Sequence, residues 1–160
     1  TLTAYYVRRS MTHIHQHRHS RRSDTMNEVK RETCADVVAD RCRSRLEDIK
    51  AIMDYTGYPA DSHPELGKLD EYGLCFDRVY PETFDDQPEG YWRWQLSYGG
   101  PSQEIRFYFD DSRESPICLP TARRCYRIEF WHLDWGDGAS VDITDDATAR
   151  RAWNWMNPVH

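Results

Sequence analysis

The 160-residue sequence lacks the features that define several large protein classes. It contains no apolar run approaching 18 residues, so no segment is predicted to span a membrane. Its beginning does not resemble a secretory signal with a charged region, an apolar region and a cleavage site. The five cysteines are odd in number and form no CxxC pair, which argues against a disulfide framework and against a zinc site. We therefore expect a soluble cytoplasmic protein with reduced, partly buried thiols, no bound metal and no membrane association.

Motifs for catalysis and phosphate binding are also missing. There is no GxSxG nucleophile motif, and the glycine-rich segment 99–101 lacks the GK[ST] ending of a phosphate-binding loop. The acids of segment 134–138 are not spaced like those of a calcium-binding loop. His132 lies two residues from Asp134 and could act as a base, but no nucleophile accompanies the pair, and its position on an apolar strand face favours a core histidine. We expect no catalytic residue and no cofactor, and therefore no enzyme.

The net charge of −6 is unevenly distributed along the chain. Residues 1–35 carry seven Lys/Arg and three Asp/Glu, whereas residues 36–160 carry fourteen and twenty-four, which gives +4 and −10. An acidic surface repels nucleic acid and attracts basic surfaces, including the nucleic-acid-binding grooves of other proteins. The sequence therefore predicts a protein partner with a basic surface and no direct binding to nucleic acid.

The first 25 residues differ in composition from the rest. They contain alternating histidines and several arginines: His13, His15, His17, His19, Arg18, Arg21 and Arg22. Alternating histidines can bind Ni²⁺ or Zn²⁺. The interpretation we favour is a disordered His/Arg-rich leader, either appended to the protein or translated from upstream. Residues 26–160 then form a single domain, beginning at Met26.

Two amphipathic helices are predicted, one at each end of this domain. The first follows Met26 and ends near Gly57 and Pro59. The second follows Thr144, whose hydroxyl is expected to cap it. In the first helix the apolar residues recur three and four apart, as a single stripe requires. The two apolar faces consist of Ala35, Val38, Cys42, Leu46, Ile49 and Met53, and of Ala149, Ala152, Trp153 and Met156.

Fifteen of the twenty-one aromatic residues lie between these helices, from Tyr72 to Trp135, in short alternating runs that predict strands. The expected strands lie within 73–80, 91–98, 104–109, 125–133 and 139–143. Alternation places Trp92, Trp94, Leu96 and Tyr98 on one face of the second strand, and Tyr126, Ile128 and Phe130 on one face of the fourth. Short glycine-containing turns join them as hairpins, and the irregular alternation of the first favours a bulge or an edge position. The fold class that follows is α+β: a four- to five-stranded antiparallel sheet with both helices packed on one face.

Acidic residues gather in the loops at the ends of these strands. The predicted partner-binding residues are Glu82, Asp85, Asp86, Glu89, Asp110, Asp111, Asp134, Trp135 and Asp137. If folding brought the clusters together, their carboxylates could occupy a basic groove that normally holds nucleic-acid phosphates. The alternative is that the acidic loops are merely solvated and confer solubility.

Several segments resemble a set of small uncharacterised proteins from bacteria, plasmids and phages. The resemblance covers roughly residues 90–156 and rests on LSYGGPS at 96–102, RF at 106–107, RIEF at 127–130 and DWGDGA at 134–139. Small acidic proteins of such origin are similar in size and charge to anti-CRISPR and anti-restriction inhibitors, several of which imitate DNA or block its binding groove. The resemblance implies a non-enzymatic inhibitor in the cytoplasm of a host cell, which binds a basic nucleic-acid-binding surface of a defence complex through its acidic loops.

Two other functions remain open at this point. The protein could be a small accessory domain that binds a small molecule or peptide through an aromatic sheet face, lined by Trp92, Trp94, Trp131 or Trp135. It could also be an enzyme that uses His132, which would require a cleft holding the imidazole beside another titratable group.

Overall fold

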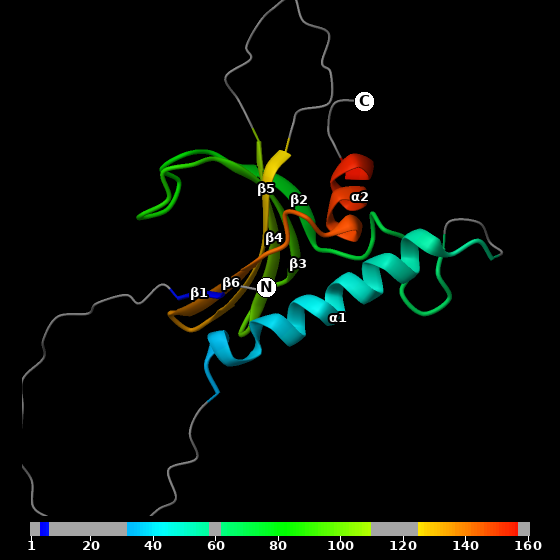
Figure 1. Cartoon of the computed structure of the whole chain (residues 1–160), viewed down its shortest axis with the longest axis horizontal. Helices are drawn as coiled ribbons and strands as arrows, with labels where there is room; N and C mark the ends of the chain where they lie inside the picture. The colour runs from blue at the N-terminus through cyan, green and yellow to red at the C-terminus, as the bar shows by residue number, and fades with distance from the viewer. Residues whose placement is uncertain (1–3, 7–31, 58–61, 110–124, 157–160) are drawn as a thin grey trace, which may run out of the picture.

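The computed structural model describes residues 4–6, 32–57, 62–109 and 125–156. In chain order the elements are β1 (Ala4–Tyr6), α1 (Cys34–Asp54), β2 (Cys75–Val79), β3 (Tyr91–Ser97), β4 (Ser102–Phe109), β5 (Cys125–Asp134), β6 (Asp137–Asp142) and α2 (Ala147–Met156). The strands form one antiparallel sheet in the order β1-β6-β5-β4-β3-β2 (Figure 1). The α+β class is therefore confirmed, as is the edge position of the strand expected within 73–80.

Helix α1 begins with a capping box. The Thr33 side chain accepts a hydrogen bond from the Asp36 amide at 3.3 Å, and the Asp36 carboxylate accepts one from the Thr33 amide at 2.9 Å. The helix therefore begins at Cys34, later than the sequence predicts, because these side chains satisfy amides that have no partner within the first turn. The Cys34 amide donates to Asp137 Oδ2 at 2.8 Å, which fixes the start of α1 to the β5–β6 turn.

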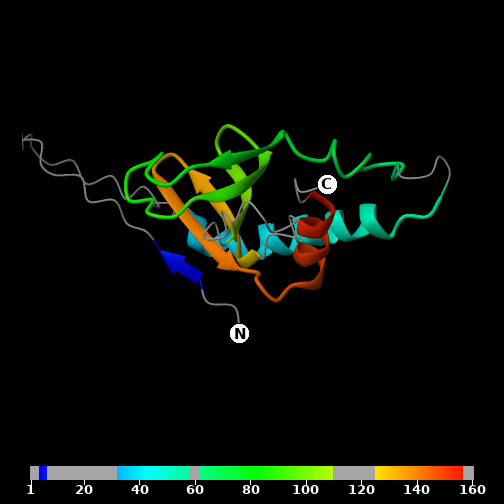
Figure 2. The ribbon, with the colours of Figure 1, turned by 90° about the horizontal axis from the view of Figure 1, so that it is seen from above.

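The two helices and one face of the sheet enclose the hydrophobic core. Trp94, Ile105, Phe130 and Val141 are successive register partners across four strands and are at most 3% exposed. Val38 and Ile49 of α1 and Trp153 of α2 belong to the same buried cluster. Burying such side chains stabilises the fold by roughly 1.5–3 kcal/mol each. Both helices lie on this side of the sheet, so the described residues form no helical layer on the other face (Figure 2).

Charged residues alternate with the core residues and lie on the helix-free face. Asp77, Arg93, Arg106, Glu129 and Asp142 are register partners across β2 to β6, so they form one row perpendicular to the strands. Arg93 donates to Asp77 at 2.8 Å within this row. The alternation of side chains along the strands thus gives the sheet one apolar face and one face that carries this charged row.

Four further local predictions were wrong. Tyr98 was expected beside Trp94 on the core face, but β3 ends at Ser97 and Tyr98 is 83% exposed. Tyr126 is also exposed, because a register shift at Tyr108/Phe109 pairs Phe109 with Cys125.

The expected cap of α2 was Thr144; instead Asp146 Oδ1 accepts from the Thr148 and Ala149 amides. We expected residues 1–25 to be disordered throughout, but Ala4–Tyr6 forms a strand that pairs with β6. The histidine-rich part of this segment lies outside the described residues.

Candidate functional site

An open groove lies on the helix-free face of the sheet, between the 80–90 loop and the β5–β6 turn. Its volume is about 660 Å³. Both boundaries project from the same side of the molecule, the loop in green and the turn in orange in Figure 1. We call this groove the acidic groove. Its charged and aromatic lining residues are Phe84, Asp85, Asp86, Glu89, Tyr91, Arg106, Tyr108, Arg127, Glu129, Trp131, Asp134, Trp135 and Asp137.

The 80–90 loop forms one rim and is held by its own hydrogen bonds. The Gln87 side-chain amide donates to the Tyr80 carbonyl at 3.0 Å, and its oxygen accepts from the Phe84 amide at 3.2 Å. The Gln87 carbonyl accepts from the Glu82 amide at 2.9 Å. Glu82 and Asp86 have positive φ angles of 61° and 59°. Gln87 therefore organises the loop around its side chain, and the exposed acids are attached to an ordered scaffold.

The β5–β6 turn forms the opposite rim. Trp135 and Gly136 have φ angles of 41° and 85°, the pattern of a two-residue type I′ hairpin turn. Asp137 holds the turn, since its Oδ1 accepts from the Gly138 amide at 2.9 Å while its Oδ2 accepts from Cys34. Trp135 is 89% exposed. A Cβ atom at Gly100 would lie 2.6 Å from Trp135 Nε1, so the edge of the indole rests against the neighbouring β3–β4 turn.

The guanidinium group of Arg106 contacts two aromatic rings in the floor of the groove. Its guanidinium carbon lies 4.8 Å from the centre of the Tyr91 ring and 4.0 Å from that of the Trp131 ring. Its Nε donates to Glu104 Oε1 at 2.6 Å, and Glu104 is buried. A cation between two aromatic rings with a carboxylate beside it is a strong arrangement, because ring quadrupoles and an opposite charge act together in a partly desolvated position.

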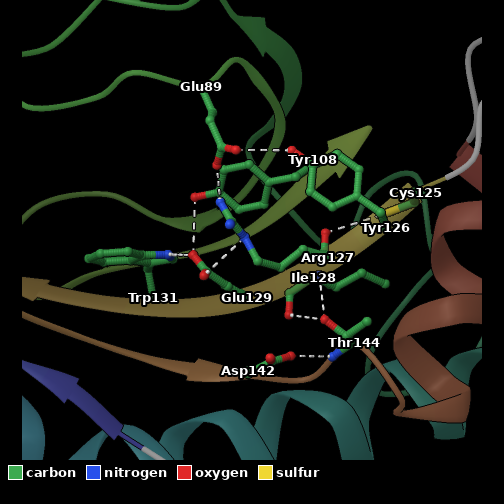
Figure 3. A network of polar contacts seen from close by, with 10 residues as sticks. All are labelled: Glu89, Tyr108, Cys125, Tyr126, Arg127, Ile128, Glu129, Trp131, Asp142 and Thr144. Carbon is green, nitrogen blue, oxygen red and sulfur yellow. Dashed lines mark hydrogen bonds and ion pairs between the residues drawn. The ribbon is translucent and has the colours of Figure 1, made fainter. Parts of the chain in front are cut away.

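A second network surrounds Arg127 (Figure 3). Its guanidinium carbon lies 3.8 Å from the centre of the Tyr108 ring, and it forms ion pairs with Glu89 and, at 3.3 Å, with Glu129. Glu129 Oε2 also accepts from the Tyr108 hydroxyl at 3.0 Å and from Trp131 Nε1 at 2.9 Å. Burial and the Glu129 charge raise the pKa of Tyr108 to about 12, so its hydroxyl stays a donor. The floor is thereby preorganised.

The charge of the groove has one dominant sign. Its lining contains six carboxylates and two guanidinium groups, a formal charge of −4. Glu89 and Glu129 both form an ion pair with Arg127, whereas Asp86 and Asp134 form no ion pair with any residue of the described ranges. The positive charges therefore lie in the floor and the uncompensated negative charges lie on the rims. Such a groove attracts a cationic ligand and repels phosphate.

The structure brings together most of the predicted partner-binding residues that it describes. Asp85, Asp86 and Glu89 line the groove on one rim, and Asp134, Trp135 and Asp137 line it on the other. Glu82 lies on the same loop but does not line the groove. Asp110 and Asp111 lie outside the described residues.

Sequence reasoning missed the residues that build the floor and the loop. Arg106, Arg127 and Gln87 were given no role, although alternation along β4 and β5 places both arginines on the face opposite the core. Of the four tryptophans considered for an aromatic surface, Trp131 and Trp135 line the groove. Trp94 is buried in the core, and Trp92 stacks on Phe76 at 5.2 Å and packs against the same core.

A smaller cavity of about 270 Å³ lies at the start of α1 and includes Cys34 and His132. Burial and the nearby Asp137 charge raise the pKa of the Cys34 thiol to about 11, so it is protonated and weakly nucleophilic at neutral pH. Burial, with the charge of Arg41, lowers the pKa of His132. His132 is 4% exposed, and its Nδ1 lies 3.5 Å from the Gln103 side-chain nitrogen. These properties describe a buried core histidine beside an unactivated thiol.

The described part of the chain contains no group of three or more His, Cys, Asp or Glu side chains arranged to hold a metal ion. None of its helices is both long and apolar enough to cross a membrane.

No protein-family model, no curated protein and no solved structure matches this chain significantly. Any function must therefore be inferred from the geometry and charge of the groove.

Proposed function

We propose that this protein is a non-enzymatic inhibitor that docks its acidic groove onto a basic, nucleic-acid-binding surface of another protein. The observation that carries the proposal is the convergence of two acidic segments, about fifty residues apart in sequence, on the rims of one groove. Like charges that gather at one site reduce folding stability through repulsion, and they give a matching cationic partner a large electrostatic attraction. The partner class we propose is a host defence complex of the anti-CRISPR target type.

The shape of the groove supports a protein partner. Both rims carry exposed aromatic residues beside their carboxylates, Phe84 at 52% and Trp135 at 89% exposure. Protein interfaces are enriched in aromatic residues, which supply contact area at low entropic cost, while charged rims govern association rate and specificity. The rims are also ordered by internal hydrogen bonds, so docking requires little rearrangement.

Inhibition of DNA binding tests this proposal. A panel of purified CRISPR effector complexes and restriction enzymes would be incubated with the protein, and DNA binding followed by electrophoretic mobility shift. We expect loss of DNA binding by at least one member. The double substitution Asp85→Lys/Asp86→Lys should weaken the inhibition about tenfold or more, because it places positive charge on a rim that faces a basic partner.

The matched control is Asp70→Lys/Glu71→Lys, since this adjacent acidic pair is also exposed and makes the same charge change outside the groove. If both double variants reduce inhibition equally, net charge and not the groove is responsible. If neither has any effect on a target that the wild-type protein inhibits, docking through the groove is refuted. Asp137→Lys is unsuitable as a probe, because Asp137 fixes both the turn and the start of α1.

A second candidate, an accessory domain that binds a peptide or small molecule through aromatic residues, draws support from Trp131 and Trp135 in the groove lining. For Trp131, however, Arg106 already stacks on the ring at 4.0 Å, which reduces the aromatic surface left for a ligand. This candidate predicts ligand-induced quenching of tryptophan fluorescence without salt dependence. The inhibitor predicts salt-dependent binding.

A further inference from the structure

Trp135 occupies a backbone position that suits other residues better. In a type I′ turn both central residues have positive φ, and asparagine, aspartate and glycine are favoured there because bulky side chains strain that conformation. Trp135 adopts φ 41° at the first of these positions, yet its side chain is 89% exposed and so gains little from burial. Neither turn chemistry nor core packing therefore explains a tryptophan at this position.

The groove floor shows what its aromatic rings bind. Arg106 lies between Tyr91 and Trp131 with Glu104 beside it, and Arg127 lies over Tyr108 with Glu89 and Glu129 beside it. Each unit combines a guanidinium group, an aromatic ring and at least one carboxylate. The same combination therefore occurs twice within the floor, built from different strands.

At the β5–β6 rim an aromatic ring and a carboxylate lie together without a guanidinium group from the described residues. Trp135 supplies the ring, and the adjacent Asp134 supplies the carboxylate. Asp134 Oδ1 would lie 3.2 Å from a Cβ atom at Gly100, on the same turn surface against which the indole rests. Within the described ranges no arginine stacks on Trp135, and Asp134 forms no side-chain hydrogen bond or ion pair.

We propose that Trp135 and Asp134 form the subsite that receives an arginine side chain of the bound partner. The guanidinium group would stack on the exposed indole and pair with Asp134, which completes the arrangement seen around Arg106 and Arg127. The formal charge of −4 on the groove lining favours a cation at this rim. The guanidinium group is the cation that both stacks on aromatic rings and pairs with carboxylates. This inference rests on the proposed function and adds to it the side chain that the groove selects.

A labelled short peptide of alternating arginine and glycine is the probe, and its binding is measured by fluorescence polarisation. The control peptide carries citrulline in place of arginine, which keeps the shape of the side chain and removes its charge. We expect the arginine peptide to bind and the citrulline peptide not to bind. Trp135→Asn should weaken binding about tenfold, and Trp135→Phe should retain most of it because a ring remains.

Two controls separate recognition from folding. Trp155 on α2 is also exposed, at 51%, and does not line the groove, so Trp155→Asn should leave binding unchanged. The thermal midpoint of Trp135→Asn should equal or exceed that of the wild type, because asparagine suits the turn. A lower midpoint together with lost binding would assign Trp135 to turn packing and overturn the proposal.

Unchanged peptide binding by Trp135→Asn would also overturn it, as would equal binding of the citrulline peptide. The variant Asp85→Lys/Asp86→Lys distinguishes these failures from failure of the proposed function. If that variant abolishes binding while Trp135→Asn does not, the groove binds basic ligands but the arginine subsite is wrong. If neither changes peptide binding, the groove itself is not the binding surface.

Discussion

The environment of Arg106 shows how single residues fix the charged face of the sheet. The guanidinium group is held between Tyr91 and Trp131, and Glu104 beside it is only 3% exposed. A carboxylate buried to this degree is costly unless an opposite charge accompanies it. Arg106 therefore has a structural task, to neutralise Glu104 and to support the floor of the acidic groove.

Arg106→Ala should lower the free energy of unfolding by about 3–5 kcal/mol, because it leaves Glu104 buried without its partner and removes packing from two rings. Urea unfolding followed by tryptophan fluorescence measures the change. The double variant Arg106→Leu/Glu104→Leu should cost clearly less than the single one, since no unpaired charge remains. Equal losses in the two variants would show that the ion pair itself, and not the stranded carboxylate, determines the stability.

At the scale of the element, α2 depends on a cap that sequence reasoning placed two residues too early. The Asp146 carboxylate accepts hydrogen bonds from two amides of the first turn, at 2.8 Å and 2.9 Å. Thr144 instead bonds with β5: its hydroxyl accepts from the Ile128 amide at 3.0 Å, as Figure 3 shows. Thr144 therefore joins this segment to the sheet, and Asp146 caps the helix.

Asp146→Ala should lower the free energy of unfolding by about 1 kcal/mol, the usual cost of losing an N-cap side chain. Asp145→Ala is the matched control, because this neighbouring aspartate is exposed and should change the stability by less than about 0.5 kcal/mol. Thermal unfolding followed by circular dichroism compares the two variants. A loss of the same size in both would show that charge near the helix start matters and that the hydrogen bonds of Asp146 do not.

At the scale of the whole molecule, the sheet separates a packed face from a charged face. Helices α1 and α2 cover one side, and no helix of the described residues covers the other side with its two projecting rims (Figure 2). The uncompensated carboxylates lie on these rims, where solvent and ions reach them. Their attraction for a partner should therefore be screened by salt far more than the buried Arg106–Glu104 pair is.

The affinity of the groove for its partner should accordingly fall steeply when the salt concentration rises from about 0.1 M to about 1 M, over which the Debye length shortens from about 10 Å to about 3 Å. The measurement is a titration of the arginine peptide, or of an inhibited target once found, at several salt concentrations. The unfolding free energy should change much less over the same range. Salt-insensitive binding would contradict an electrostatic docking surface.

Alternation and helical periodicity were sufficient to predict the α+β class and both helices on one face. The spacing of apolar side chains shows which face of each helix or strand is buried, and this spacing is read within each segment by itself. Element ends were less predictable, because Thr33 and Asp146 act as caps through side-chain geometry that several nearby residues could also supply. The exposure of Tyr126 depended on a register shift, which no pattern within β5 alone reveals.

The sequence by itself determined the sign of the charge and the residues that carry it, since ionisable groups and their spacing are fixed by composition. Only the tertiary structure decided that the 80–90 loop and the β5–β6 turn face each other across one groove. It also decided that Arg127 pairs with Glu89, whereas Asp134 beside Trp135 has no such cation among the described residues. The physical reason is that electrostatic interaction depends on distance through space, and strand pairing sets that distance between residues far apart in the chain.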